Sequence, residues 1–121
     1  MGNTFYHAET ATRRFLEWWI AIAASRGIDA SQMSQLGALL TYAGLHDVRA
    51  ETKTLPVGSW GGRVGKLLAQ NMLAGWPSMR PLARSLVGVP AATFDEVIGQ
   101  LEAEWNDRQT TYEVYCVCGQ V

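Results

Sequence analysis

The chain has 121 residues, of which 48% are apolar and 17% charged, and its ten basic and eleven acidic side chains leave a net charge of −1. This balance excludes the basic surface that nucleic-acid binding requires. No apolar run reaches the roughly twenty residues of a membrane span, and no segment has the pattern of a signal peptide, so we expect a cytoplasmic protein. Because charged residues are fewer than the usual quarter, we also expect an apolar face shared with a partner.

An amphipathic helix is predicted first, because apolar residues recur at three- and four-residue spacing over positions 15–23. Thr10 or Thr12 is expected to cap its start, and Gly27 to end it. Trp19 is the second of two adjacent tryptophans. Exposing both rings is unfavourable, so at least one is expected in the core or against a partner.

A second helix is predicted to follow a capping-box-like start at Asp29 and Gln32 and to end at Gly44. Positions 48–55 then alternate small or β-branched residues with the charged residues Arg49, Glu51 and Lys53. This alternation predicts a strand with one wet face, which suits the edge of a sheet.

The next stretch, 55–75, is a glycine-rich turn that leads into a helix. Pro56 is expected to stop strand pairing. Trp60 lies at the tip of the turn beside Arg63, where it either folds back on the core or forms the wall of a pocket. The residues expected to share the buried face of the helix are Val64, Leu67, Leu68 and Met72.

Positions 76–110 are predicted to be helical. Pro77 and Pro81 bracket an expected break before a short helix that ends at Gly88, and Thr93 with Glu96 forms a capping-box pattern for a longer helix. The expected core positions are Met79, Leu82, Leu86 and Val87 in the short helix, and Phe94, Val97, Ile98, Leu101 and Trp105 in the long one.

A final strand is predicted over 111–118, with the composition of a strand buried between neighbours. Cys116 and Cys118 lie two residues apart on one face of this strand, which is poor geometry for a mutual disulfide, so we expect buried, reduced thiols. His7 and His46 show no metal-ligand spacing, so no metal site is expected.

Four segments carry a family resemblance: FLEWWIAIAASRGID at 15–29, LLTYAGLHDVRAET at 39–52, LPVGSWGGRVG at 55–65 and YEVYCVCGQ at 112–120. In this order and spacing they resemble the C-terminal part of class I S-adenosylmethionine-dependent methyltransferases, especially a bacterial small-molecule group. The resemblance implies a mostly helical α+β segment of a Rossmann-like fold. In it, helices are followed by two antiparallel strands with a helical insertion between them.

On that resemblance the chain is a single partial domain, 1–121. Helices and the penultimate strand would occupy 1–55, a helical cap 56–110, and the last strand 111–121. The family's glycine-rich loop and acidic cofactor contacts belong to an N-terminal half. We therefore expect no cofactor-binding residue in this chain alone, and S-adenosylmethionine only if such a half pairs with it.

The resemblance also implies candidate site residues. His7 follows the position of the family's fifth strand, so it is the candidate catalytic residue, as a general base or an orienting group; otherwise it is merely solvated or packed. Asn71 lies in an apolar helical run, where it meets either a buried hydrogen-bond partner or a ligand. The candidate substrate-binding residues are Tyr6, Trp19, Trp60, Arg63, Asn71 and Trp76.

Three functions remain open from the sequence. The chain is the substrate-capping part of a small-molecule methyltransferase, or a stand-alone dimeric relic that binds or rearranges a small apolar ligand without cofactor, or a structural partner of an intact methyltransferase. A two-stranded sheet is marginal and the last strand is apolar. Its free edge is therefore expected to be covered by a complementary methyltransferase half or by a second copy in a homodimer.

Overall fold

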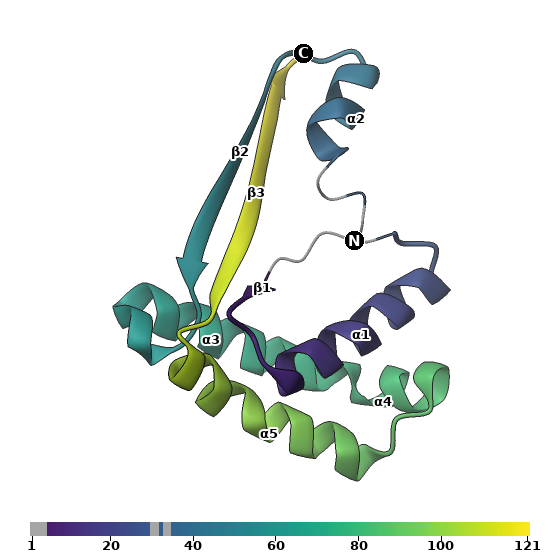
Figure 1. The fold of residues 1–121 in the computed structure, drawn as a ribbon. Coiled ribbons are helices and arrows are strands. Elements are labelled where there is room, and N and C mark those ends of the chain that lie inside the picture. The colour runs from purple at the N-terminus through teal and green to yellow at the C-terminus, as the bar shows by residue number, and fades with distance from the viewer. Residues whose placement is uncertain (1–4, 30–31, 33–34) are drawn as a thin grey trace.

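A computed structural model describes residues 5–29, 32 and 35–121. It is an α+β fold in which a body of helices carries a long, narrow antiparallel sheet that rises from one end (Figure 1). The elements in chain order are β1 (Phe5–Tyr6), α1 (Thr10–Ser25), α2 (Leu36–Tyr42), β2 (His46–Pro56), η2 (Ser59–Gly61), α3 (Gly62–Gly75), η3 (Trp76–Met79), α4 (Arg80–Leu82), η4 (Ala83–Val87), α5 (Ala91–Arg108) and β3 (Thr111–Gln120).

The two predicted strands form a ribbon. β2 pairs antiparallel with β3 in a continuous register from Arg49 opposite Cys118 to Pro56 opposite Thr111. Both strands and their antiparallel pairing around a helical segment were predicted correctly, as was the edge position of β2. β2 begins two residues before its predicted start, and β3 ends two residues after its predicted end. Pro56 does not stop the pairing as expected: it is the last residue of β2 and still pairs with Thr111.

A third strand, β1, was not predicted. Phe5 pairs with Tyr112 and Tyr6 with Thr111, on the side of β3 opposite β2. The expectation of a two-stranded sheet was therefore wrong. Two residues carry no alternation pattern, so this strand is defined only by its tertiary pairing. It covers the base of the β3 edge, next to the helical body.

The core lies in the body, where α1 packs on α5. The predicted inner face of α5 is confirmed for its four buried residues, and Ile98 is partly buried beside them. α5 nevertheless begins at Ala91, because the N–H of Phe94 already donates to the Pro90 carbonyl. Thr93 thus lies inside the helix, and its capping role was predicted wrongly. The fully buried larger side chains are Phe15, Val57, Phe94, Val97, Leu101 and Trp105.

The start of α1 differs from prediction. Glu9 occupies the N-cap position without a side-chain cap, and neither Thr10 nor Thr12 serves as one. The Thr12 hydroxyl instead donates to the Glu104 carboxylate of α5, which also accepts the Thr12 N–H. A carboxylate from a neighbouring helix has taken over the capping function. Gly27, with φ of 77°, ends the helix as predicted.

α2 packs against the far end of the ribbon (Figure 1). Gly37 lies at this contact, where a Cβ would sit at an ordinary van der Waals distance of 3.5 Å from the Cβ of Ala50. The predicted start at Asp29 and Gln32 was wrong, because α2 begins at Leu36 with Gln35 at its N-cap position. Gly44, with φ of 97°, follows the end of the helix as predicted.

α3 buries part of the predicted face. Leu68 and Met72 are partly buried against the core as predicted, whereas Val64 and Leu67 are 53% and 54% exposed.

Small residues supply the rest of the buried face of α3, since Gly65 and Ala69 are both buried. They allow the first turn of α3 to lie close to the turn that follows β2, where the Gly58 N–H donates to the Gly65 carbonyl over 2.9 Å. No apolar spacing predicts this contact.

The predicted break between Pro77 and Pro81 is absent. The chain continues through η3, α4 and η4 with only changes of helical type. Each proline lies at the start of its segment, where no intrahelical N–H is required. Met79 and Leu82 are partly buried as predicted, but Leu86 and Val87 are exposed by 49% and 36%.

The cysteine prediction was correct for redox state and wrong for burial. Cys116 and Cys118 are free thiols, and both are exposed. They lie opposite Glu51 and Arg49, on the face of the ribbon away from α2. No described element covers that face, so the outer part of β3 is not buried between neighbours as predicted.

Candidate functional site

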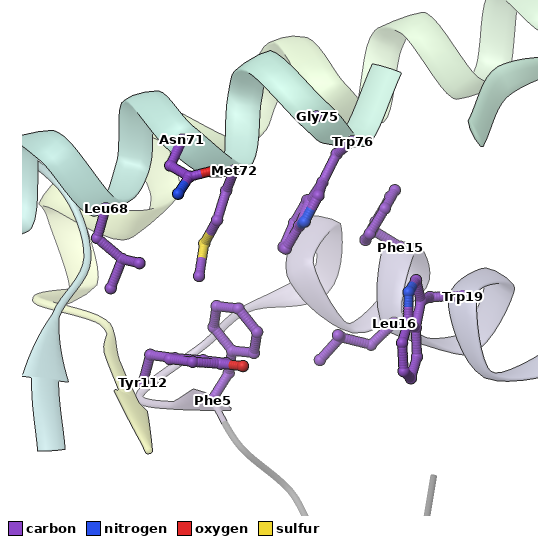
Figure 2. A pocket seen from close by; sticks show the side chains of 10 residues that line it. All are labelled: Phe5, Phe15, Leu16, Trp19, Leu68, Asn71, Met72, Gly75, Trp76 and Tyr112. Atoms are coloured by element: carbon purple, nitrogen blue, oxygen red, sulfur yellow. The ribbon is translucent and has the colours of Figure 1, made fainter. Parts of the chain in front are cut away.

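A pocket of about 470 Å³ lies where α1, α3, β1 and β3 meet (Figure 2). Side chains at adjacent and four-residue spacings on α1 form one wall, and residues at three- and four-residue spacings on α3 form the other. This volume is within the range of about 300–1,000 Å³ that is usual for small-molecule sites. The lining residues are Phe5, Phe15, Leu16, Trp19, Leu68, Asn71, Met72, Gly75, Trp76 and Tyr112.

Aromatic contacts hold the inner wall of the pocket in place. The Trp76 ring stacks on Phe15 at 4.1 Å between centroids and meets Trp105 edge-on at 5.6 Å. Phe5 contacts Trp76 edge-on at 5.8 Å, and contacts Tyr112 at 4.8 Å. Because Trp105 is fully buried, this cluster continues into the core and keeps the wall preformed.

The pocket is apolar with few polar groups. Asn71 points its amide toward the pocket from α3, and Tyr112 enters from β3 on the opposite side (Figure 2). Within the described chain, neither side chain has a hydrogen-bond partner. Burial raises the pKa of the Tyr112 hydroxyl above its usual value, so this group remains protonated and able to donate at neutral pH.

Three of the predicted substrate-binding residues come together here. Trp19, Asn71 and Trp76 all line the pocket, although Trp19 on α1 is far in sequence from Asn71 on α3 and Trp76 on η3. Asn71 is exposed rather than buried, so its amide faces the open pocket and not the core. The apolar members Phe15, Leu16, Leu68 and Met72 were expected only as core positions of their helices.

Trp60 and Arg63 do not line this pocket. The Trp60 indole folds back, and its N–H donates to the Val57 carbonyl over 2.7 Å. Its backbone N–H donates to the side-chain oxygen of Asn106. Arg63 is exposed at the start of α3. Backbone N–H groups of the glycine-rich turn are likewise hydrogen-bonded within the chain: Gly58 donates to the Gly65 carbonyl, and Gly61 donates to the Gly58 carbonyl.

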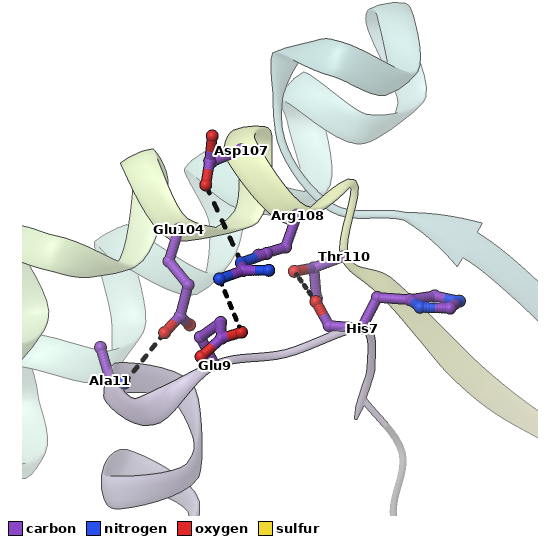
Figure 3. A network of polar contacts seen from close by, with 7 residues as sticks. All are labelled: His7, Glu9, Ala11, Glu104, Asp107, Arg108 and Thr110. Carbon is purple, nitrogen blue, oxygen red and sulfur yellow. Dashed lines mark hydrogen bonds and ion pairs between the residues drawn. The ribbon is translucent and has the colours of Figure 1, made fainter.

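Tyr6 and His7 also lie outside the pocket lining. The Tyr6 hydroxyl donates to the Glu113 carboxylate over 2.7 Å, and this hydrogen bond raises the pKa of Tyr6. His7 has a left-handed backbone with φ of 56°, and its carbonyl accepts the Thr110 hydroxyl at 2.9 Å. Its exposed ring points away from the neighbouring polar contacts (Figure 3).

A polar network joins the start of α1 to the end of α5 (Figure 3). Glu104 accepts the backbone N–H of Ala11 at 2.9 Å, and Arg108 pairs with Glu9 at 2.9 Å. The Trp105 indole N–H donates to the Thr12 hydroxyl at 2.9 Å. These contacts fix α1 relative to α5, and so position the α1 wall of the pocket.

Phe5 and Tyr112 are the pocket residues that sequence reasoning missed. They come from opposite ends of the chain and meet because β1 pairs with β3 in the register Phe5 to Tyr112. No spacing rule relates residues so far apart. The available signal was the aromatic character of both segments.

The part of the chain that the structure describes offers no group of three or more His, Cys, Asp or Glu side chains that could hold a metal ion. Its pocket lining contains no carboxylate for the hydroxyl groups of a nucleoside cofactor. None of its helices is long and apolar enough to cross a membrane.

Comparisons with protein-family models, with curated proteins and with solved structures found no match to this chain.

Proposed function

We propose that this chain is the substrate-capping C-terminal part of an S-adenosylmethionine-dependent methyltransferase, and that the aromatic pocket holds its small apolar substrate. The observation that carries this proposal is the convergence of Trp19, Asn71 and Trp76 on one preformed cavity. A mostly apolar pocket with a few orienting polar groups is the usual form of a small-molecule site.

The order of the sheet supports the proposal. The last strand, β3, lies between two antiparallel neighbours, with β2 on one side and β1 on the other. The resemblance assigns the family's fifth strand to the edge of β3 that β1 occupies. The helical segment between β2 and β3 supplies α3 and η3, from which Asn71 and Trp76 reach the pocket.

In this function the bound cofactor supplies the methyl group, and it is held by a complementary N-terminal half. The residues of this chain bind and orient the acceptor and exclude water from it. The aromatic wall around Trp76 provides the apolar contact, and Asn71 provides the orienting hydrogen bond. The described pocket lining contains no general base. His7 remains a candidate for that role only if another segment brings a substrate to it.

Titration calorimetry with the purified chain tests both parts of this proposal. We expect no heat from S-adenosylmethionine alone, and saturable binding of small neutral apolar compounds. Trp76→Ala should abolish that binding, whereas Trp60→Ala, which alters an indole outside the pocket lining, should leave it unchanged. Binding of S-adenosylmethionine to the chain alone would contradict the missing-half proposal, and equal loss in both variants would contradict the pocket assignment.

A second candidate function is a stand-alone dimer that binds an apolar ligand without cofactor. The observation that favours it is the contrast between the two sheet edges. The edge strand β2 carries Arg49, Glu51 and Lys53, whereas the described strand β1 covers β3 only at Thr111 and Tyr112. Beyond those two residues β3 carries a single charged side chain, Glu113, and an edge with so few charges favours pairing with another strand. Light scattering separates the two functions, because a stable dimer that binds apolar compounds but not S-adenosylmethionine supports the second.

A further inference from the structure

The polar and aromatic groups of the pocket select among small ligands. We infer that the pocket takes an uncharged, planar aromatic molecule that carries one oxygen group, such as a phenol or an aromatic ketone, oriented by the Asn71 amide. This inference rests on the proposed function, since it names the class of ligand for the same site.

The ligand is uncharged because the described lining offers no counter-ion. Among those ten residues there is no lysine, arginine, histidine, aspartate or glutamate. A charge moved from water into such a site without a partner loses more hydration energy than the contacts return. The nearest carboxylate to Tyr112 in sequence, Glu113, is already engaged by the Tyr6 hydroxyl.

An organic cation is the main competitor, because rings of tryptophan and tyrosine can form a cage around quaternary ammonium groups. Such a cage presents several free ring faces to the cation. Here Phe15 covers one face of Trp76 with the planes only 6° apart, and Phe5 lies tilted against Tyr112. Aliphatic side chains of Leu16, Leu68 and Met72 fill much of the remaining wall. The pocket is therefore better suited to another ring than to a cation.

A planar aromatic ligand gains more binding energy from the walls of this pocket than a ligand of another shape. Five of the ten lining side chains are aromatic, and ring pairs contribute beyond simple burial of area. The contacts of Trp76 with Phe15, Trp105 and Phe5 hold its ring before any ligand arrives. A rigid ligand entering a rigid site loses little conformational freedom.

The oxygen group follows from the two polar side chains. The Asn71 amide offers two donors and an acceptor, and the protonated Tyr112 hydroxyl offers one donor and an acceptor. Both lack hydrogen-bond partners among the described residues, and they line the pocket from different elements, Asn71 from α3 and Tyr112 from β3 (Figure 2). A ligand oxygen beside either group can satisfy it as it loses water, whereas a pure hydrocarbon leaves both unpaired.

Calorimetric titrations at pH 7 with four naphthalene probes test this inference: 2-naphthol, naphthalene, 2-naphthoate and 2-naphthyltrimethylammonium. We expect 2-naphthol to bind about tenfold more tightly than naphthalene, which corresponds to one well-formed hydrogen bond. The two charged probes should bind at least about a hundredfold more weakly than 2-naphthol.

A variant pair locates the effect. Asn71→Leu should lower the affinity for 2-naphthol to that for naphthalene and leave naphthalene binding within about twofold of the parent. Gln70→Leu, at an exposed neighbouring position outside the pocket lining, should change neither affinity. Tighter binding of the ammonium or the carboxylate, or equal binding of naphthol and naphthalene, would overturn the inference while leaving the binding site itself in place. If no probe binds, the proposed function fails together with it.

Discussion

The helical body and the β2–β3 ribbon differ in how far their side chains are buried. All the fully buried side chains that the structure describes belong to the body and its junction with the sheet, whereas α2 and the two long strands contribute none. The body therefore supplies its own core. The ribbon has one face partly covered by α2 and the other open, so its stability depends on strand pairing and on whatever covers its open face.

The largest expected effect contrasts a core residue of the body with a half-buried apolar residue of the ribbon. Trp105→Ala should lower the free energy of unfolding by about 3–5 kcal/mol, because it opens a cavity and removes the hydrogen bond to Thr12. Val117→Ala, in the ribbon beside α2, should cost less than about 1 kcal/mol. Urea denaturation of both variants measures the difference. Similar losses would mean that the ribbon has a core of its own.

The junction between the two regions gives the next largest effect. Gly65→Ala should cost about 2–3 kcal/mol, because the added Cβ would collide with the Gly58 carbonyl oxygen and force α3 away from the turn after β2.

Gly99→Ala is the matched control, since nothing lies within 4 Å of a Cβ at that helical position. It should stabilise the protein by about 0.5–1 kcal/mol. Thermal unfolding measured by circular dichroism distinguishes the two. A harmless Gly65→Ala would show that α3 does not depend on this close approach.

Within the body, removing the Glu104 carboxylate of α5, which caps the start of α1, should have a smaller effect on stability. Glu104→Ala should lower the free energy of unfolding by about 1–2 kcal/mol, because the N–H groups of Ala11 and Thr12 lose their acceptor. Glu102→Ala, exposed on the same helix, should change it by no more than about 0.5 kcal/mol. Chemical denaturation at constant pH provides the comparison, and equal values would remove the capping role.

The smallest effect concerns Tyr112, where the ribbon enters the body. Burial raises the pKa of its hydroxyl in the folded state, so the unfolded chain loses this proton first. The stabilisation that Tyr112 gives the folded state is fully present below the usual tyrosine pKa of about 10. The free energy of unfolding should therefore fall as the pH rises above that value toward the pKa of Tyr112 in the folded state.

Tyr112→Phe should make stability fall less steeply at alkaline pH. The pH dependence of the urea midpoint between neutral and alkaline pH measures this change. Tyr6→Phe should flatten a separate part, because the hydrogen bond to Glu113 raises the Tyr6 pKa as well. A profile of Tyr112→Phe that coincides with that of the parent would contradict the assignment.

Local patterns were sufficient to predict the regular elements. The alternation of 48–55 and the β-branched, aromatic run of 111–118 identified both long strands, and the spacing from Phe94 to Trp105 identified α5. These signals succeed because each element buries one face of fixed periodicity. Gly27 and Gly44 marked helix ends because both adopt positive φ.

The failures share a cause, which is that a distant segment overrides the local pattern. Glu104 accepts a hydrogen bond from the Thr12 hydroxyl, which lies near the other end of the chain, and Gly65 is buried by a backbone contact with Gly58 that no apolar spacing predicts. Two residues of the candidate site have the same origin. Trp19, Asn71 and Trp76 were suggested by residue type, whereas Phe5 and Tyr112 become neighbours only through the pairing of β1 with β3.

The connection between β2 and β3 also bears on the order of folding. Pro56 and Thr111 are paired neighbours, yet the whole helical segment lies between them in sequence, and the Val57 N–H donates to the Thr110 carbonyl at its base. The ribbon therefore cannot zip from a local turn. The intervening helices must first bring their two ends together, because long-range pairing is reached only after the loop has closed. During synthesis β2 emerges well before its partner and waits unpaired, so the charges on Arg49, Glu51 and Lys53 protect a nascent strand as well as a finished sheet.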